Sequence, residues 1–248
     1  MQNDTPFFRY RIEFFLGKPF FPCSIIFSVQ TMMLPYSKAD AIRHLEKCGL
    51  YIMKPNNIDR FVSCGVDAFT SSSLYKYFFK GKDYDKKLTL AIESLVKTTG
   101  EEGLLYADSE EVNGYAQWYP PGFTGNSLWT FMSSGAWRYL FMPDFFSTLH
   151  RINYVEDFSF RRKKEITNNQ DLFLITLAVR TSMHRKGIAR KLIHPMLEYA
   201  TSIRRPCYLE TFEAVNTLIY KHLGFVQLMR TKLEGTPETH YPMVFKAH

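Results

Sequence analysis

A nearly continuous apolar run, "DLFLITLAV" at residues 171–179, precedes a short basic turn and then an amphipathic segment. An apolar run of this length without alternation is typical of a strand buried on both faces, at the centre of a sheet. The segment after the turn, residues 187–203, has apolar residues at helical spacing, and we predict a helix that packs on that sheet. A buried strand, a turn and a helix in this order indicate an α/β fold.

The rest of the chain extends this pattern on both sides. Caps, periodicity and glycine stops predict helices at 37–49, 56–79 (in one or two pieces), 86–103 and 214–225. Strands are predicted at 50–55, 207–212, 226–233 and 240–246, with a hairpin at 104–122. Residues 123–170 form an aromatic-rich insertion, helical in pieces around Pro143. The expected fold class is α/β (α+β), with mixed strand pairing.

We expect a single domain over residues 36–248, preceded by an N-terminal extension, 1–35. The extension has an apolar run behind Arg9 and Arg11 that resembles a signal peptide, but two prolines and the lack of a small-residue cleavage site argue against one. The run is also shorter than the roughly 20 residues of a membrane span. A natural start at Met32 or Met33 is the third interpretation, and it is favoured by the ordinary domain patterning that follows.

Charge and cysteine usage narrow the class of protein. The formal net charge of +7 favours an anionic partner, which could be nucleic acid, a membrane surface or a phosphorylated ligand. Basic clusters lie at 161–164, 184–191 and 204–205 without the spacing of an RNA-binding or zinc-finger motif, and the first and third are expected to be solvated. Four widely separated cysteines without a CxxC pair indicate neither a metal site nor a disulfide framework, so we expect a reduced, cytoplasmic protein without a metal.

The basic turn itself has the features of a phosphate site. Amides at the start of a helix have no intrahelical partner and attract anions. Gly187 lets a ligand approach the backbone, and Arg185, Lys186 and Arg190 add positive charge. The patterns GxxxxGK[ST] and GxGxxG are absent, so the turn is neither a P-loop nor a dinucleotide fingerprint.

Two stretches carry a family resemblance. "LAVRTSMHRKGIARKLI" resembles the acetyl-CoA-binding motif [Q/R]xxGx[G/A] of the GNAT superfamily of N-acetyltransferases, here at residues 184–189, with His184 where Gln or Arg is usual and Thr181 in place of a frequent Pro. "YLETFEAVNTLIYKHLGF" resembles the second half of that fold, where an Asn precedes a helix that carries a Tyr. "AQWYPPG" and the LET segment give a narrower likeness to acetyltransferases of the puromycin-modifying type, in which a His often stands at the position of Asp171.

The resemblance implies a mostly antiparallel sheet, splayed between the strands at 171–179 and 207–212, with acetyl-CoA as cosubstrate between them. Backbone groups of 177–179 are expected to pair with the pantetheine arm, and amides of 185–190 are expected to hold the pyrophosphate. The residues expected to bind acetyl-CoA are Leu177, Ala178, Val179, His184, Arg185, Lys186, Gly187, Ile188, Ala189, Arg190, Asn216 and Tyr220.

The implied reaction is direct attack of an amine on the thioester. An alkylammonium has a pKa of about 10.4 and must lose a proton first, so a base is needed. Glu210 is the nearest plausible base; an exposed carboxylate paired with Arg or Lys is an equally good interpretation of it. Tyr220 is the candidate acid for the departing thiolate, because it lies off the apolar stripe of its helix and beside Asn216. That stripe, expected to pack on the sheet, consists of Val215, Leu218, Ile219 and Leu223.

The acceptor pocket is expected to be lined by aromatic side chains of the insertion and the WYPPG loop, although an inserted helical pair also needs such residues for its own core. The candidates are Trp118, Tyr119, Trp129, Phe131 and Trp137. The predicted function is acetyl-CoA-dependent N-acetylation of a small-molecule amine, with neither nucleic acid nor membrane as a partner and with a homodimer left open. A catalytically silent acyl-CoA-binding sensor and a basic nucleic-acid binder are the alternatives.

Overall fold

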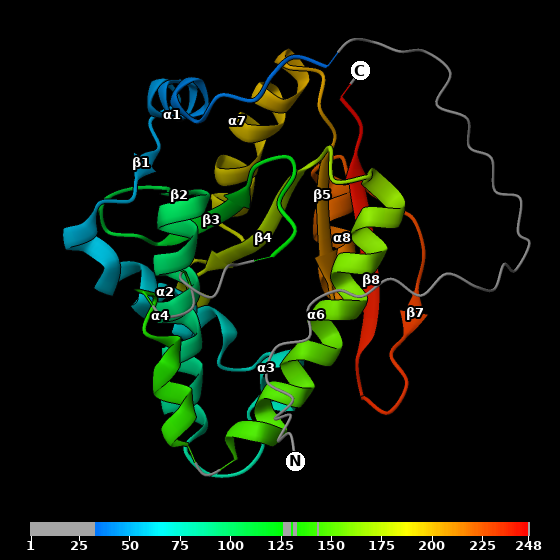
Figure 1. The fold of residues 1–248 in the computed structure, drawn as a ribbon. Coiled ribbons are helices and arrows are strands. Elements are labelled where there is room, and N and C mark those ends of the chain that lie inside the picture. Colours follow the sequence, from blue (N-terminus) through cyan, green and yellow to red (C-terminus); the bar gives the residue numbers. More distant parts are fainter. Residues whose placement is uncertain (1–32, 126–129, 131–132, 143, 248) are drawn as a thin grey trace, which may run out of the picture. The chain divides into compact units, whose positions relative to one another are not determined.

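The computed structural model describes residues 33–125, 130, 133–142 and 144–247, which lie in one compact unit, Met32–His248 (Figure 1). The expectations for residues 1–32, for Trp129, for Phe131 and for Pro143 fall outside the described residues. The α-helices are α1 (Lys38–Lys47), α2 (Ile58–Phe69), α3 (Ser73–Phe78), α4 (Tyr84–Glu102), α6 (Phe145–Thr167), α7 (Ile188–Ser202) and α8 (Ala214–His222), with 3-10 turns η1 (Pro55–Asn57), η2 (Ala136–Phe141) and η3 (Thr181–Met183).

The strands form one mixed sheet in the order β1-β2-β3-β4-β5-β8-β6, with β7 paired to β8. They are β1 (Tyr51–Ile52), β2 (Leu104–Ala107), β3 (Gly114–Tyr119), β4 (Leu172–Val179), β5 (Cys207–Thr211), β6 (Val226–Gln227), β7 (Thr231–Lys232) and β8 (Thr239–Phe245). Every pair is antiparallel except β4 with β5. The predicted fold class, α/β with a mostly antiparallel sheet, is therefore confirmed. One predicted strand, 226–233, is instead two short strands, β6 and β7, which pair separately with β8.

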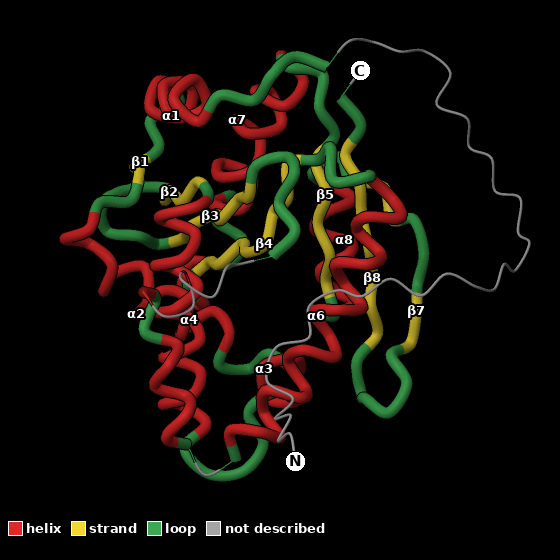
Figure 2. The backbone as a smooth tube through the Cα atoms, viewed as in Figure 1, coloured by secondary structure: helices red, strands yellow, loops and turns green. Residues whose placement is uncertain are grey.

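Helices cover both faces of the sheet (Figure 2). One core cluster joins α1 and α7 to inward residues of the central strands, among them Trp118, Leu174 and Leu209. A second cluster joins α2, α3 and α4 to the other face, and a third joins α6 to Tyr208 and its neighbours on that same face. Because side chains alternate along a strand, the sheet separates an α7 side from an α6 side. We call the first cluster the α7-side cluster and the third the α6-side cluster. No helix in the described part of the chain is long and apolar enough to cross a membrane.

The β2–β3 hairpin determines how closely the first turn of α7 packs on the sheet. A Cβ on Gly114, the first residue of β3, would lie 2.6 Å from Ile188 Cγ2, so glycine is what allows the first turn of α7 to pack this closely on the sheet. The hairpin turn before it, 108–113, is held by Asp108, whose carboxylate accepts the Gly114 amide at 2.9 Å. The start of α7 is thus set by the β2–β3 hairpin as well as by its own sequence.

The insertion is joined to the central strand by a buried ion pair. Lys163, in the last turns of α6, lies 3.3 Å from Asp171, which directly precedes β4, and both side chains are at most 1% exposed. The ammonium also donates to Asn169 Oδ1 at 3.0 Å and to the Phe123 carbonyl. Asp171 therefore has a structural partner at the position where the family resemblance had suggested a His.

Candidate active site

The parallel strands β4 and β5 stay paired over only three positions. Leu172 pairs with Cys207, Phe173 with Tyr208 and Leu174 with Leu209, and between the described strands the pairing then stops. On the other edge of β4, Trp118 pairs with Leu174 but Gln117 pairs with Thr176, so Ile175 is an extra residue in the ladder. Such a bulge bends a strand, and Figure 1 shows β4 and β5 diverging beyond it. We call the diverging ends, residues 175–179 and 210–211, the splay.

The turn after β4 presents the start of a helix to open space. Gly187 adopts a left-handed conformation with φ of +80°, no side chain caps α7, and no atom lies within 4 Å of where a Cβ would be. Arg185, Lys186 and Arg190 are exposed around it. Free helix amides and three cations, next to a glycine without steric obstruction, are the features that binding of an anion requires.

The first half of this turn is tied to α2 and to the β2–β3 hairpin. Asp67 accepts the Thr181 amide at 2.6 Å, and the Arg180 guanidinium donates to the Val112 carbonyl and to Ser63 Oγ. His184 Nε2 lies 3.1 Å from the Val179 carbonyl. The imidazole that replaces the usual Gln or Arg therefore contacts backbone of the segment expected to pair with the pantetheine arm.

The rest of α7 follows the predicted pattern. Its buried residues include Ile188, Leu192, Ile193, Met196, Leu197 and Ala200, whereas Arg190, Lys191 and Glu198 are exposed. Ala189 is half-buried beside Gly187. Leu177 and Val179 pack against the α7-side cluster, and Ala178 is buried on the opposite face.

Glu210 lies on β5 immediately past the last β4–β5 pair. Its carboxylate is 2.7 Å from His240 Nε2 on β8, and it accepts the Tyr208 hydroxyl at 3.3 Å. The side chain is only 12% exposed. The interpretation of Glu210 as an exposed carboxylate paired with Arg or Lys is therefore wrong, because the strand register turns it inward to an imidazole.

His240 is the functional candidate that sequence reasoning missed. It is fully buried, and its ring lies edge-on to Phe158 of α6 at 5.2 Å and tilted against Phe212 at 5.6 Å. Its Nδ1 atom has no hydrogen-bond partner in the described structure. No motif surrounds His240 in "ETHYPM", and only the pairing of β5 with β8 brings it to Glu210.

Tyr220 lies on the packed side of α8, which reverses the predicted helical stripe. Three of the four residues expected to pack on the sheet are exposed: Val215 (65%), Leu218 (57%) and Ile219 (46%). Tyr220 instead packs on the α7-side cluster, with its ring 6.0 Å from Phe225. The short helix packs on β5, β6 and β8, so one narrow face lies against the sheet, with Thr217 and Leu223 buried and Tyr220 half-buried. Asn216 is half-buried one turn earlier.

The two catalytic candidates lie on opposite faces of the sheet. Glu210 bonds to Tyr208, a member of the α6-side cluster, whereas Tyr220 packs on the α7-side cluster. Burial raises the pKa of Tyr220 to about 12, which keeps its hydroxyl protonated at neutral pH. A proton acceptor on one face and a proton donor on the other, at strands that diverge, suit a transfer reaction between two substrates.

The three aromatic candidates for an acceptor pocket that the structure describes do not lie together. Trp118 is 1% exposed in the α7-side core, where its indole donates to Tyr106 at 3.0 Å, and Tyr119 stacks on Phe123 at 3.6 Å on the other face. Trp137 is 40% exposed on η2, against Phe141. These placements favour packing roles for Trp118 and Tyr119.

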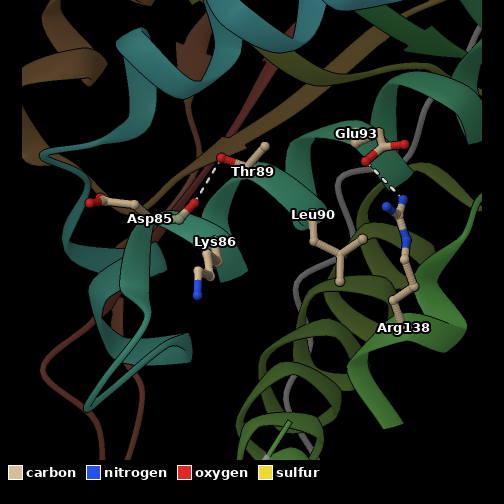
Figure 3. A pocket seen from close by; sticks show the side chains of 6 residues that line it. All are labelled: Asp85, Lys86, Thr89, Leu90, Glu93 and Arg138. Carbon is tan, nitrogen blue, oxygen red and sulfur yellow. Dashed lines mark hydrogen bonds and ion pairs between the residues drawn. The ribbon is translucent and has the colours of Figure 1, made fainter. Parts of the chain in front are cut away.

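Two shallow surface depressions, of about 320 and 480 Å³, lie away from Glu210 and Tyr220. The first is bordered by α4 and η2, and Figure 3 shows the Arg138–Glu93 ion pair of 2.8 Å and the Thr89–Asp85 hydrogen bond of 2.7 Å in its lining. The second is lined in part by Asp67 and Arg180, which anchor the basic turn. Neither contains a buried ionisable pair, so the splay is the stronger candidate site.

One side-chain group in the described residues has the composition of a metal site. His44 on α1, Cys48 directly after α1 and Glu198 on α7 place one ligand atom each within 4.8 Å of one another. The group is largely exposed, and Glu198 lies eleven residues, or about 16 Å of helix, from Gly187. It takes no part in the splay.

Comparison with known proteins gives the fold. No protein-family model matches the chain, and no curated protein matches it. Solved structures match with TM-scores above 0.5. A protein described as "histone acetyltransferase HPA2 and related acetyltransferase" from Corynebacterium glutamicum has a TM-score of 0.54 at 18% identity, covering 80% of this chain and 96% of that one. Arylalkylamine N-acetyltransferase 2 from Aedes aegypti has 0.56 at 14%, covering 80% and 98%.

The C-terminal condensation domain of Ebony, solved with beta-alanyl-dopamine, has a TM-score of 0.57 at 7% identity, covering 79% of this chain and 97% of that one. The chain therefore has the fold of the GNAT acetyltransferases, as its two motifs predicted. The comparisons do not support the narrower likeness to the puromycin-modifying type.

Proposed function

We propose that the protein is an acetyl-CoA-dependent N-acetyltransferase that acts on a small-molecule amine. The observation that carries the proposal is the splay: β4 and β5 separate after Leu174 and Leu209, between an open cationic helix start on one side and a buried Glu210–His240 pair on the other. Two of the structures that share the fold are described as acetyltransferases, which supports the same class of reaction.

The residues present fit coenzyme A. Past the last β4–β5 pair, Leu177, Ala178 and Val179 pair with β3 on one edge, and the other edge can pair with the amides of a pantetheine arm as with an added strand. The pyrophosphate would be held by the amides around Gly187 and by the exposed Arg185, Lys186 and Arg190. Asn216 and Tyr220 of α8, the helix that follows β5, would border the arm from the β5 side.

The proposed reaction uses both faces of the splay. Glu210, oriented by His240, accepts a proton from the ammonium of the acceptor, and the freed amine attacks the thioester carbonyl carbon. A C–N bond forms, the C–S bond breaks, and the Tyr220 hydroxyl gives its proton to the departing sulfur. The nitrogen then sheds its second proton, which returns Tyr220 to the hydroxyl form, and Glu210 releases its proton to solvent. The products are the N-acetylated amine and free coenzyme A. A binding module without turnover would not need a buried proton acceptor, so the Glu210–His240 pair favours catalysis.

The binding half of the proposal is tested by Gly187→Glu, with Gly49→Glu as a matched control. Both glycines have positive φ, +80° and +73°, and neither has an atom within 4 Å of an added Cβ, so strain and charge change alike. Gly187→Glu places a carboxylate where the pyrophosphate would bind, and we expect acetyl-CoA affinity in calorimetry to fall by about a hundredfold or more. Gly49→Glu should bind like the wild type.

Equal acetyl-CoA affinity in wild type and Gly187→Glu would contradict the phosphate assignment. The nucleic-acid alternative is tested in the same samples by thermal unfolding. Acetyl-CoA should raise the melting temperature of the wild type, because a ligand stabilises the folded state that binds it. No rise with acetyl-CoA, together with a salt-sensitive rise with RNA, would support the basic binder instead.

A further inference from the structure

The α6 side of the splay carries more acid than one proton transfer requires. The chain has a formal charge of +7, yet three carboxylates gather where the ends of β5 and β8 meet α3. They belong to Glu210, to Glu213, which follows β5, and to Glu238, which precedes β8. Figure 1 places α3 beside the lower part of α6, next to these strand ends.

Ser73, the first residue of α3, draws two of these carboxylates together. Its amide donates to Glu213 Oε1 at 3.1 Å, and its hydroxyl donates to Glu238 Oε2 at 3.0 Å. Glu213 is half-buried and is the member reached from solvent, whereas Glu238 is 2% exposed. Two acids that share one serine form a small negative site with its own scaffold.

One oxygen of this site lacks a donor. Glu238 Oε1 is buried without any hydrogen-bond partner in the part of the chain that the structure describes. Burial raises the pKa of Glu238, and the neighbouring Glu213 raises it further, against the opposing effects of Ser73 and Lys232. A buried carboxylate oxygen left without a donor is unfavourable. A positively charged hydrogen-bond donor would remove that penalty.

The spacing relates the negative site to the proposed base. Glu238 precedes by two residues His240, whose ring contacts Glu210, and two residues of extended chain span about 7 Å. Phe212 connects the two groups from the β5 side, since it lies against His240 and directly precedes Glu213. A molecule with one nitrogen at Glu210 and a second at Glu238 would span this stretch of chain together with the His240–Glu210 contact.

We propose that Glu238 and Glu213 bind a second ammonium group of the acceptor, so that the acceptor is a short alkyl diamine. The inference rests on the proposed function for the role of Glu210. The amine at Glu210 loses its proton and is acetylated, whereas the amine at Glu238 stays protonated and pairs with the two carboxylates. The free Oε1 atom accepts a hydrogen bond from that ammonium.

The test compares putrescine with butylamine, which has the same carbon chain but a single amine. Calorimetry at fixed ionic strength should show putrescine binding about tenfold or more tighter than butylamine, the factor expected for one charge-assisted hydrogen bond. Glu238→Gln keeps the shape and the bond from Ser73 but removes the charge, and should abolish the preference while butylamine and acetyl-CoA affinities stay unchanged. Glu234→Gln, an exposed change in the same hairpin, should keep the preference.

Binding is measured without turnover, so this result does not depend on whether the protein is a catalyst. Equal affinity for the two amines in the wild type, or a preference that survives in Glu238→Gln, would overturn the proposal. Preference for putrescine without acetyl transfer to any amine would leave the diamine site standing and remove the proposed function. If both hold, kcat/KM should favour putrescine by the same factor as the affinity.

Discussion

Tyr220 is a side chain whose chemistry can be separated from its packing, because only the hydroxyl is needed as an acid. Tyr220→Phe keeps the ring against Phe225 and the α7-side core. We expect kcat to fall by about a hundredfold, as for loss of a general acid, with acetyl-CoA affinity unchanged. Steady-state kinetics and calorimetry measure the two quantities.

The pH profile adds a second readout for Tyr220. A tyrosine acid is active below its pKa, and burial raises this pKa to about 12. The wild-type kcat should therefore not decline between about pH 8 and pH 10, where an ordinary tyrosine of pKa about 10 would begin to ionise. Tyr84→Phe, which removes a hydroxyl that donates to Thr70, serves as the control and should behave like the wild type. Unchanged turnover in Tyr220→Phe would remove Tyr220 as the acid.

At the residue scale, the sequence predicts the placement of side chains that belong to local motifs. The open helix start at Gly187 and the exposed cations around it could be predicted, because one strand, one turn and one helix are contiguous in sequence. His240 could not, because its contact with Glu210 depends on the register of two strands thirty residues apart. The prediction that Val215, Leu218 and Ile219 of α8 pack on the sheet was wrong. A short helix buries only one narrow face, and α8 has more apolar residues than that face has positions.

At the scale of elements, the insertion is fastened to the central strand by Lys163 and Asp171. Lys163→Met leaves the Asp171 carboxylate buried without its counter-charge, and we expect the free energy of unfolding to fall by about 3–5 kcal/mol. Urea denaturation at neutral pH measures this loss. The double variant Lys163→Met/Asp171→Asn removes the stranded charge and should recover part of the stability.

Lys164→Met is the control for this prediction, because Lys164 is the next residue and is exposed. It should change the free energy of unfolding by less than about 0.5 kcal/mol. A Lys163→Met protein as stable as Lys164→Met would show that the ion pair contributes nothing and that α6 is held by its apolar face alone.

Element boundaries with a local cause were predictable from the sequence. Ser37 caps α1 by accepting the Asp40 amide, and α4 ends at Gly103, both at the positions that capping rules indicate. The strand expected at 226–233 breaks into β6 and β7 instead, because Leu228 donates its amide to Pro242 while β7 pairs further along β8. That division depends on the partner strand and leaves no trace in the local sequence.

At the scale of the whole sheet, the functional geometry comes from strand order. The sheet has β8 between β5 and β6, so His240 on the last strand lies next to Glu210 on β5. The family resemblance implied a splay between β4 and β5, but the extra residue at Ile175 and the end of pairing at Leu209 become visible only in three dimensions. In the function that we propose, the two faces of the splay have separate roles, a cationic entrance for a phosphorylated ligand and an acidic one for an amine.

The measurement that tests this account most directly is amine-dependent release of thiol from acetyl-CoA. Wild-type protein with putrescine, butylamine or phenethylamine should release coenzyme A in step with N-acetylated amine detected by mass spectrometry. Glu210→Gln should lower kcat by about 10²–10⁴-fold with acetyl-CoA affinity retained. Acetyl-CoA bound by the wild type with no thiol released by any amine would contradict the account and define a binding module on the same fold.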